Sequence, residues 1–432
     1  MKNLSVFQTI LLAGFGAFAI AGVLIFALVV GSGAGNAVGP VVIWGTADAN
    51  AFTAVLRQAS ENEGRLAQVT YVQKDPVTYE NELTEALASG GGPDLFLLRQ
   101  DYVVQNVGKV VPIPYDYLTL AQFDDTFVES AQPYLAQSGV LGVPIFVDPL
   151  LLYWNRDSFG SAGYAKPPQY WDELAGVAGK IVKRDDSDRI QKAAVAFGEY
   201  QNVENAKDIL SLLILQAGGE IVKRDNTERL TPALSARAAG ATTQPTESAL
   251  RFYTEFADPS KAHYSWNRSF ANSRVAFASG DLAMYLGYAS EARLIARTNP
   301  NLNFAAAPIP QARGLNSIDV ARVYALAVSR ASRNPSGALT AASIMADTSF
   351  ARALSTALGM PSARRDVLSE RGQDENVLFE SQAIIARSWI DPNPEKTADI
   401  FRAMIESVTS GAARYGEAIS RADQQMAQLT GQ

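Results

Sequence analysis

The sequence predicts an α/β protein of two domains that follows an N-terminal transmembrane helix. The chain has 432 residues, too many for one ordinary hydrophobic core, which predicts two domains. Strand-like and helix-like stretches alternate from Val41 onward, the order that produces a parallel sheet. Before them, Ile10 to Val30 is apolar at every position.

The N-terminal segment is typical of a membrane anchor. No charged residue lies between Lys2 and Asp48, and the apolar run would be roughly 30 Å long as a helix, the thickness of a bilayer core. Secretory signal peptides have shorter apolar regions, about 7–15 residues. We therefore expect an uncleaved helix with its N-terminus in the cytoplasm, since Lys2 is the flanking positive charge, and a domain on the outer face of the cytoplasmic membrane. Cleavage after the small residues at 34–37 remains an alternative.

Composition excludes several classes of function. The net charge of −7 argues against a nucleic-acid-binding surface, which needs clustered lysine and arginine. The chain has no cysteine, so disulfides, thiolate nucleophiles and cysteine-ligated metals are absent. His263 is the single histidine, and its surroundings, AHYSW, lack a nucleophile elbow. We therefore expect no cofactor, no metal site and no catalytic residue.

Five consecutive stretches carry the α/β pattern. Residues 41–50 and 67–73 read as strands, residues 51–64 and 75–92 as helices closed by glycine, and residues 93–98 as a third strand. This order predicts βαβ units, in which ligands lie beyond the carboxyl ends of the strands.

Two similar segments, IVKRDDSDRI (181–190) and IVKRDNTERL (221–230), predict hairpins with Asp/Asn turns. The acidic cluster from Asp185 to Asp188 leaves calcium binding open, although it lacks the glycine and the distal glutamate of an EF-hand loop. The C-terminal tail predicts one or two amphipathic helices.

An ordered set of motifs resembles a known family, the extracellular solute-binding proteins of ABC importers, and within it the sugar-binding group that includes maltose-binding protein. The resemblance runs from about Val41 to the C-terminus. Its motifs are, in order, VVIWG, GGGPDLF, GVPIFVDPLLLYWNRDSFGSAGY, PPQYWDEL, AFGEY, AGGEIV, ALRFYTEF, FASGDLAMYLGY, APIPQ, YALAVSRAS and LGMPSARRDVL.

The resemblance implies a two-lobed, periplasmic-binding-protein-like fold with a ligand cleft between the lobes. The segment VDPLL would be the first crossover, where Pro149 holds Asp148 in an extended conformation and interrupts the strand ladder. The expected division is an anchor and tether (1–40), first lobe (41–147), second lobe (148–300), a return to the first lobe (301–345) and a helical second-lobe part (346–432).

The resemblance also implies the ligand-contacting residues. Carboxylates accept strong hydrogen bonds from sugar hydroxyls, and flat rings pack against a pyranose. The acids are Asp48 and Asp101 after first-lobe strands and Asp148 at the crossover, each of which could instead be a helix cap or a turn residue. The second-lobe candidates are Glu199, Tyr200, Trp266, Tyr285 and Tyr288. The family often has Trp where this chain has Tyr288-Ala289, a departure that bears on a maltodextrin-like ligand.

These observations predict a membrane-tethered, monomeric receptor that captures a solute, a sugar or oligosaccharide, and delivers it to ABC permease subunits. A hydrolase that uses paired carboxylates such as Asp48 and Asp148 is one alternative. A ligand-sensing ectodomain without an importer is another. The sequence leaves the solute open between sugar, peptide and polyamine.

Overall fold

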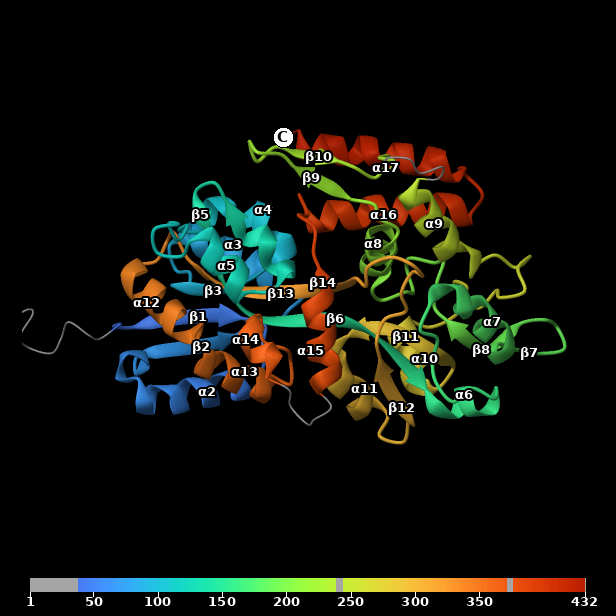
Figure 1. The fold of residues 1–432 in the computed structure, drawn as a ribbon, viewed down its shortest axis with the longest axis horizontal. Helices are drawn as coiled ribbons and strands as arrows, with labels where there is room; N and C mark the ends of the chain where they lie inside the picture. Colours follow the sequence, from blue (N-terminus) through green and yellow to red (C-terminus); the bar gives the residue numbers. More distant parts are fainter. Residues whose placement is uncertain (1–37, 238–243, 371–375, 432) are drawn as a thin grey trace, which may run out of the picture.

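The computed structural model describes residues 38–237, 244–370 and 376–431. Within these ranges the chain forms two α/β lobes joined by strands that run from one lobe into the other (Figure 1). No helix of these ranges is long and apolar enough to cross a membrane. The predicted transmembrane segment, Ile10 to Val30, lies outside the described residues.

One large sheet extends through both lobes. The strands are β1 (Val41–Gly45), β2 (Val69–Gln73), β3 (Leu95–Arg99), β4 (Leu135–Ala136), β5 (Gly139–Val140), β6 (Val143–Asn155), β7 (Lys183–Arg184), β8 (Ile190–Val195), β9 (Val222–Arg224), β10 (Leu230–Pro232), β11 (Leu282–Tyr288), β12 (Phe304–Ala307), β13 (Asp319–Val328) and β14 (Ala386–Arg387). In the large sheet the order is β2-β1-β3-β13-β6-β11-β8-β7, with β12 on β6 and β14 on β13. Strands β4 and β5, and strands β9 and β10, form two separate two-stranded sheets. The predicted parallel pairing of β1 with β2 and β3 is confirmed.

Helices cover the sheet in both lobes (Figure 1). They are α2 (Ala49–Asn62), α3 (Tyr79–Ser89), α4 (Val103–Asn106), α5 (Leu120–Thr126), α6 (Arg156–Ser161), α7 (Trp171–Ile181), α8 (Ala206–Gln216), α9 (Pro245–Glu255), α10 (Ser273–Ser279), α11 (Ala292–Thr298), α12 (Pro335–Met345), α13 (Thr348–Leu358), α14 (Arg365–Ser369), α15 (Asn376–Ile385), α16 (Pro394–Thr409) and α17 (Tyr415–Thr430). The predicted amphipathic tail is confirmed as α16 and α17, whose apolar faces enter the second-lobe core.

Strand β6 belongs to both lobes. Its residues 143–149 pair with β13, and residues 150–154 pair with β11. The expected interruption at Pro149 is wrong, because Pro149 lies opposite Ala321 inside one continuous strand. Proline fits extended backbone, so the strand continues and the change of lobe comes from a change of neighbouring strands.

Two hydrophobic clusters define the lobes. The first holds core residues of 38–147 and 321–386, and the second holds core residues of 150–320 and 400–426. The division therefore differs from the expected one: residues 301–320 stay in the second lobe, and residues 346–386 pack mainly in the first. Helix α13 shows the reason, since Phe350 packs edge-on against Phe52 of α2, with ring centroids 6.4 Å apart.

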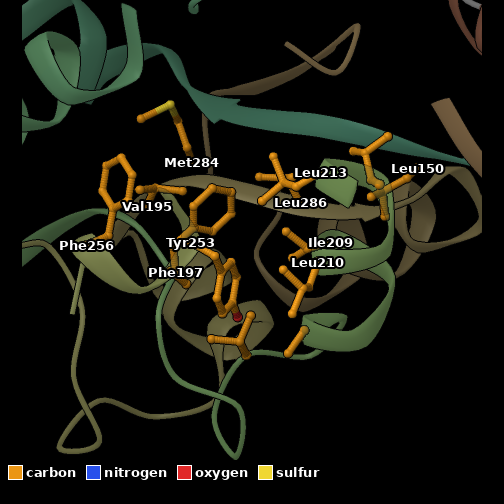
Figure 2. Packing of buried hydrophobic residues seen from close by; sticks show 14 of the residues in the cluster. Leu150, Val195, Phe197, Ile209, Leu210, Leu213, Tyr253, Phe256, Met284 and Leu286 are labelled. Carbon is orange, nitrogen blue, oxygen red and sulfur yellow. The ribbon is translucent and has the colours of Figure 1, made fainter. Parts of the chain in front are cut away.

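The second-lobe core is rich in aromatic and branched side chains (Figure 2). Leu286 of β11 lies beside Leu213 of α8, and Phe197 lies among the rings of Tyr253 and Phe256. Burial of each such side chain stabilises the fold by about 1.5–3 kcal/mol. This packing fixes the strand ends of the second lobe in place.

Both predicted hairpins are present, as β7–β8 and β9–β10. In the first, the Asp185 carboxylate accepts the backbone N–H groups of Ser187 and Arg189, both at 2.9 Å, so it is engaged in the turn itself. Asp225 accepts the N–H groups of Thr227 and Arg229 in the same way.

Candidate functional site

A cavity of about 420 Å³ lies between the two lobes, beside the crossing strands. First-lobe, crossing-strand and second-lobe residues all line it; among them are Thr46, Ala47, Glu80, Arg99, Tyr102, Phe146, Asp148, Arg322, Tyr324, Glu204, Asn205, Arg274, Ser290 and Glu291. A hollow of about 500 Å³ shares Glu204 and Asn205 with it, and a small one of about 30 Å³ shares Arg322. We call these three adjoining spaces the interlobe cleft.

Asp148 is the buried acid where β6 passes between the lobes. It is 2% exposed, and Ser290 donates its backbone N–H to Oδ1 (2.9 Å) and its hydroxyl to Oδ2 (2.6 Å). Burial raises the pKa of Asp148 to about 6, against the lowering effect of the Ser290 hydrogen bonds and of the Arg322 charge. A poorly solvated carboxylate of this kind gains strongly from any further hydrogen-bond donor.

Arg322 faces the same position from β13. It lies opposite Asp148 in the strand register, and its guanidinium carbon is 3.8 Å from the centroid of the Tyr288 ring. Its Nη2 is 3.2 Å from Oδ2 of Asp208 at the start of α8. Arg322 thus ties the crossing strands to the second lobe.

The first-lobe wall follows the carboxyl end of β3. Arg99 donates two hydrogen bonds to the Asp101 carboxylate, at 2.6 and 2.8 Å, and its guanidinium lies 5.0 Å from the Tyr102 ring. Burial raises the pKa of the neighbouring Glu80 carboxyl to about 6, although Asn106 donates a hydrogen bond to it. This wall offers both charge signs and a half-buried ring.

The second-lobe wall is built around Arg274. Its Nη1 lies 3.3 Å from Glu204 and 3.6 Å from Glu291. Glu291 also accepts the Tyr285 hydroxyl at 2.5 Å and the backbone N–H of Tyr288 at 2.9 Å. These bonds fix the segment that carries Ser290, the partner of Asp148.

The smallest hollow of the cleft adjoins the return of the chain to the second lobe. There Lys207 Nζ lies 2.7 Å from Asp391 Oδ2 and 5.5 Å from the Trp389 ring centroid. Lys207 and Asp208 also border the 500 Å³ hollow, so the polar surface continues from one space to the next.

The structure places four of the sequence-predicted acids and tyrosines in the cleft lining. Asp148 lines the main cavity, and Asp101 and Tyr288 line the small hollow. Tyr200 lines the third space, and burial raises its pKa to about 12. Asp48 is exposed and caps α2 by accepting the Ala51 N–H at 2.9 Å, directly after the lining residue Ala47.

Three other predicted residues have their side chains turned into packing or ion pairs. Trp266 is 0% exposed, stacks on Phe270 with centroids 4.5 Å apart, and donates to Asn202 at 3.0 Å. Tyr285 is 2% exposed, beside Tyr153. Glu199 is 8% exposed and accepts a hydrogen bond from Arg268 at 2.7 Å.

Sequence reasoning did not identify Lys207, Arg274, Arg322 or Tyr324, which all line the cleft. One signal was available for Arg322. It interrupts the apolar stretch DVARVYALAV, and a charge inside such a strand has to find a polar partner.

The cleft can hold a polar solute by many hydrogen bonds. Three arginines and four carboxylates line the main cavity, so it offers both hydrogen-bond donors and acceptors. The positive and negative charges of these side chains nearly cancel. No group of three or more histidine, aspartate or glutamate side chains that could hold a metal ion occurs within the described part of the chain.

Solved structures share the two-lobed fold. A cyclic α-maltosyl-1,6-maltose binding protein from Arthrobacter globiformis has a TM-score of 0.75 at 16% identity, covering 91% of this chain and 99% of that chain. An ABC transporter solute-binding protein from Thermotoga lettingae, bound with α-D-tagatose, has a TM-score of 0.69 at 20% identity, covering 91% and 100%. The sugar-binding protein MalE from Xanthomonas citri has a TM-score of 0.71 at 18% identity, covering 91% and 97%.

Comparison of the amino-acid sequence finds related proteins and a matching family model. A protein of Brucella abortus (strain 2308), named only as a binding protein, is 30% identical over 101 residues, which are 23% of this chain and 25% of that relative. The match thus spans about a quarter of the length of the curated relatives. The family model for bacterial extracellular solute-binding proteins matches residues 44–347, more than half of the chain. This protein therefore belongs to the bacterial extracellular solute-binding protein family.

Proposed function

We propose that the protein captures a sugar or oligosaccharide in the interlobe cleft and delivers it to the permease of an ABC importer. The observation that carries the proposal is the cavity itself, which both lobes and both crossing strands line with hydrogen-bonding groups. The charged groups are largely paired with one another, as in Arg99–Asp101 and Arg274–Glu204. A lining of this kind suits a neutral ligand with many hydroxyl groups better than a strongly charged one.

Two features of the lining support a sugar in particular. Tyr102 and Tyr324 are half-buried rings that can pack against the apolar face of a pyranose. Asp148 supplies a desolvated carboxylate for a hydroxyl. The names of the structural relatives, which bind maltosaccharides or tagatose, agree with this assignment.

The proposed contacts follow from the lining. They are Asp101, Asp148, Tyr200 and Tyr288 from the sequence prediction, together with Arg99, Tyr102 and Arg322. Closure of the two lobes over the solute would exclude water and strengthen these hydrogen bonds. Asp48 lies next to the cleft and would join after closure.

The proposal extends to location and partners. The apolar segment from Ile10 to Val30 would hold a monomer at the outer face of the cytoplasmic membrane, near its permease. N-terminal sequencing of the mature protein tests this. A mature chain that starts near Val38 would exclude the anchor.

Binding without turnover is the remaining part of the proposal. Purified protein should leave aryl glycosides and oligosaccharides unchanged. Hydrolysis that disappears in the Asp148→Asn variant would instead identify a carbohydrate-active enzyme.

The central test is a thermal-shift screen of the full chain in detergent against mono- and oligosaccharides, amino acids, peptides and polyamines. A solute at 100 times its Kd should add about 2.7 kcal/mol of stability. Calorimetry then measures the affinity, and small-angle scattering should show compaction with the solute. A screen in which only peptides or polyamines stabilise the protein would contradict the sugar assignment.

A further inference from the structure

The charges that line the main cavity of the interlobe cleft nearly cancel in number, but they are not paired evenly. Each of the three arginines lies beside a carboxylate, in the pairs Arg99–Asp101 (2.6 Å), Arg274–Glu204 (3.3 Å) and Arg322–Asp208 (3.2 Å). Glu291 of the lining lies 3.6 Å from Arg274 as well. The remaining carboxylates of the lining are Glu80 and Asp148, and neither forms an ion pair with any residue that the structure describes. Every cation of the cavity is thus engaged, whereas two anions are not.

Within the described residues, neutral donors hold both of these carboxylates. Asn106 donates a side-chain N–H to Oε2 of Glu80 at 3.3 Å, and Ser290 donates its N–H and its hydroxyl to Asp148. Burial raises the pKa of each acid to about 6, so both are mainly ionised at pH 7. Asp101 shows the contrast, because burial acts on it too, yet the charge and the hydrogen bonds of Arg99 bring its pKa below the usual value. A buried carboxylate that lacks such a cation gains strongly from a positively charged ligand group.

Two rings of the same lining also suit a positive charge. Tyr102 and Tyr324 are half-buried and border the cavity that Glu80 and Asp148 line. The face of a tyrosine ring attracts an ammonium group within about 6 Å of its centroid. Tyr102 already makes one contact of this kind, with the Arg99 guanidinium 5.0 Å away. The rings and the two carboxylates are independent features, and both favour a positively charged group on the solute.

We propose that the solute is an amino sugar, whose ammonium group is bound by the unpaired carboxylates of Glu80 and Asp148. This inference rests on the proposed function, since it names the class of sugar that the same cleft takes. The paired charges of the lining would serve the neutral hydroxyl groups of the sugar ring. A neutral sugar would leave the two carboxylates without a counter-charge, and an acidic sugar would add a further negative charge. The three arginines of the lining disfavour a polyamine, which carries several positive charges.

Calorimetry on the full chain in detergent at pH 7 tests the proposal with matched pairs of sugars. Each pair differs only in an amino group that replaces a hydroxyl: glucosamine and glucose, galactosamine and galactose, and the β-1,4-linked glucosamine dimer and cellobiose. We expect at least one amino sugar to bind, and to bind about tenfold or more tightly than its neutral partner, because a charged hydrogen bond replaces a neutral one. N-acetylglucosamine, which has no charge, should bind as weakly as glucose.

Variants locate the ammonium group. Glu80→Gln and Asp148→Asn should each reduce the preference for the amino sugar over its neutral partner by about fivefold or more, since each removes one negative charge from the cavity. The control is Glu85→Gln, which makes the same change at an exposed glutamate of the same helix, α3, outside the cleft lining. It should keep the full preference. Urea unfolding of each variant shows that the fold is intact.

Four outcomes would overturn the inference, and they separate it from the proposed function. Neutral sugars that bind as tightly as their amino partners would overturn the inference alone. An equal loss of preference in Glu85→Gln would show only a general effect of charge. Failure of all the amino sugars to bind would also overturn it, whereas a neutral sugar found in the wider screen would keep the proposed function. Binding of spermidine without binding of any sugar would overturn both.

Discussion

Replacing Asp148 with asparagine removes the buried charge of the cleft and keeps nearly the same shape. The carboxyl is 2% exposed, and burial raises its pKa from 3.8 to about 6. A pKa shift of roughly 2 units corresponds to about 3 kcal/mol, which is an upper bound on the free-energy cost of keeping this carboxyl ionised in the folded protein.

The sign of the pH dependence follows from the raised pKa. Between about pH 4 and pH 6 the folded protein holds a proton that the unfolded chain has released, so stability from this group falls as pH rises through that window. Above about pH 6 the whole penalty is present, and below about pH 4 it vanishes. The asparagine variant carries no such penalty at any pH.

We therefore expect Asp148→Asn to be more stable than the parent at pH 7.5, by up to about 3 kcal/mol, and equal to it near pH 4. Its solute affinity should fall roughly ten- to hundredfold, because a hydrogen bond to a charged acceptor is lost. Urea unfolding at pH 4, 6 and 7.5 measures the first effect, and calorimetry measures the second.

Asp116→Asn, at an exposed acid outside the cleft, controls for the loss of one negative charge. The reasoning fails if Asp148→Asn is less stable than the parent at pH 7.5 by the same margin as at pH 4. It also fails if the variant binds the solute as tightly as the parent does.

Further variants test the remaining geometry. Trp266→Ala should lower the free energy of unfolding by about 3–5 kcal/mol, because the ring is 0% exposed; Trp266→Phe should recover much of it in urea unfolding. Tyr102→Ala should leave the melting temperature within a few degrees and weaken the solute by roughly tenfold in calorimetry, through loss of a stacking face. Arg322→Gln should raise the pKa of Asp148 above about 6, since the arginine charge lowers it, which a carboxyl NMR titration measures. The first prediction is contradicted if Trp266→Ala is as stable as the parent, and the second if Tyr102→Ala binds the solute with unchanged affinity. The third is contradicted if the titration of Asp148 is unchanged in Arg322→Gln.

Local periodicity predicted the beginning of the first lobe and the C-terminal helices of the second. The strands and helices from β1 to β3 and the helices α16 and α17 follow from apolar spacing and glycine stops over short stretches. The assignment of α13 failed, because its lobe depends on the contact of Phe350 with Phe52, far away in the chain. The spacing of apolar residues over ten or fifteen positions predicts a helix or strand, but it does not predict which distant element packs against it.

The site shows the same limit. Asp148 could be identified because a lone acid between two apolar runs has no local explanation. Trp266, placed between polar residues, reads as exposed, yet the Ser265 hydroxyl oxygen accepts the N–H groups of Ala194 and Val195, both at 2.9 Å, and draws the segment onto β8. Such long-range hydrogen bonds leave no periodic signal in the sequence.

The ion pairs of the cleft bear on the closure that we propose. Arg99 and Asp101 both belong to the first lobe, and Arg274 and Glu204 both belong to the second. Arg322 joins a crossing strand to Asp208 of the second lobe. Among the described residues that line the main cavity, no ion pair connects the two walls directly, so neither wall holds the other by charge. A ligand can shift the lobes toward closure only by its stronger binding to the closed form. In the proposed closure, the solute, hydrogen-bonded to both walls, would therefore supply the free energy that brings them together.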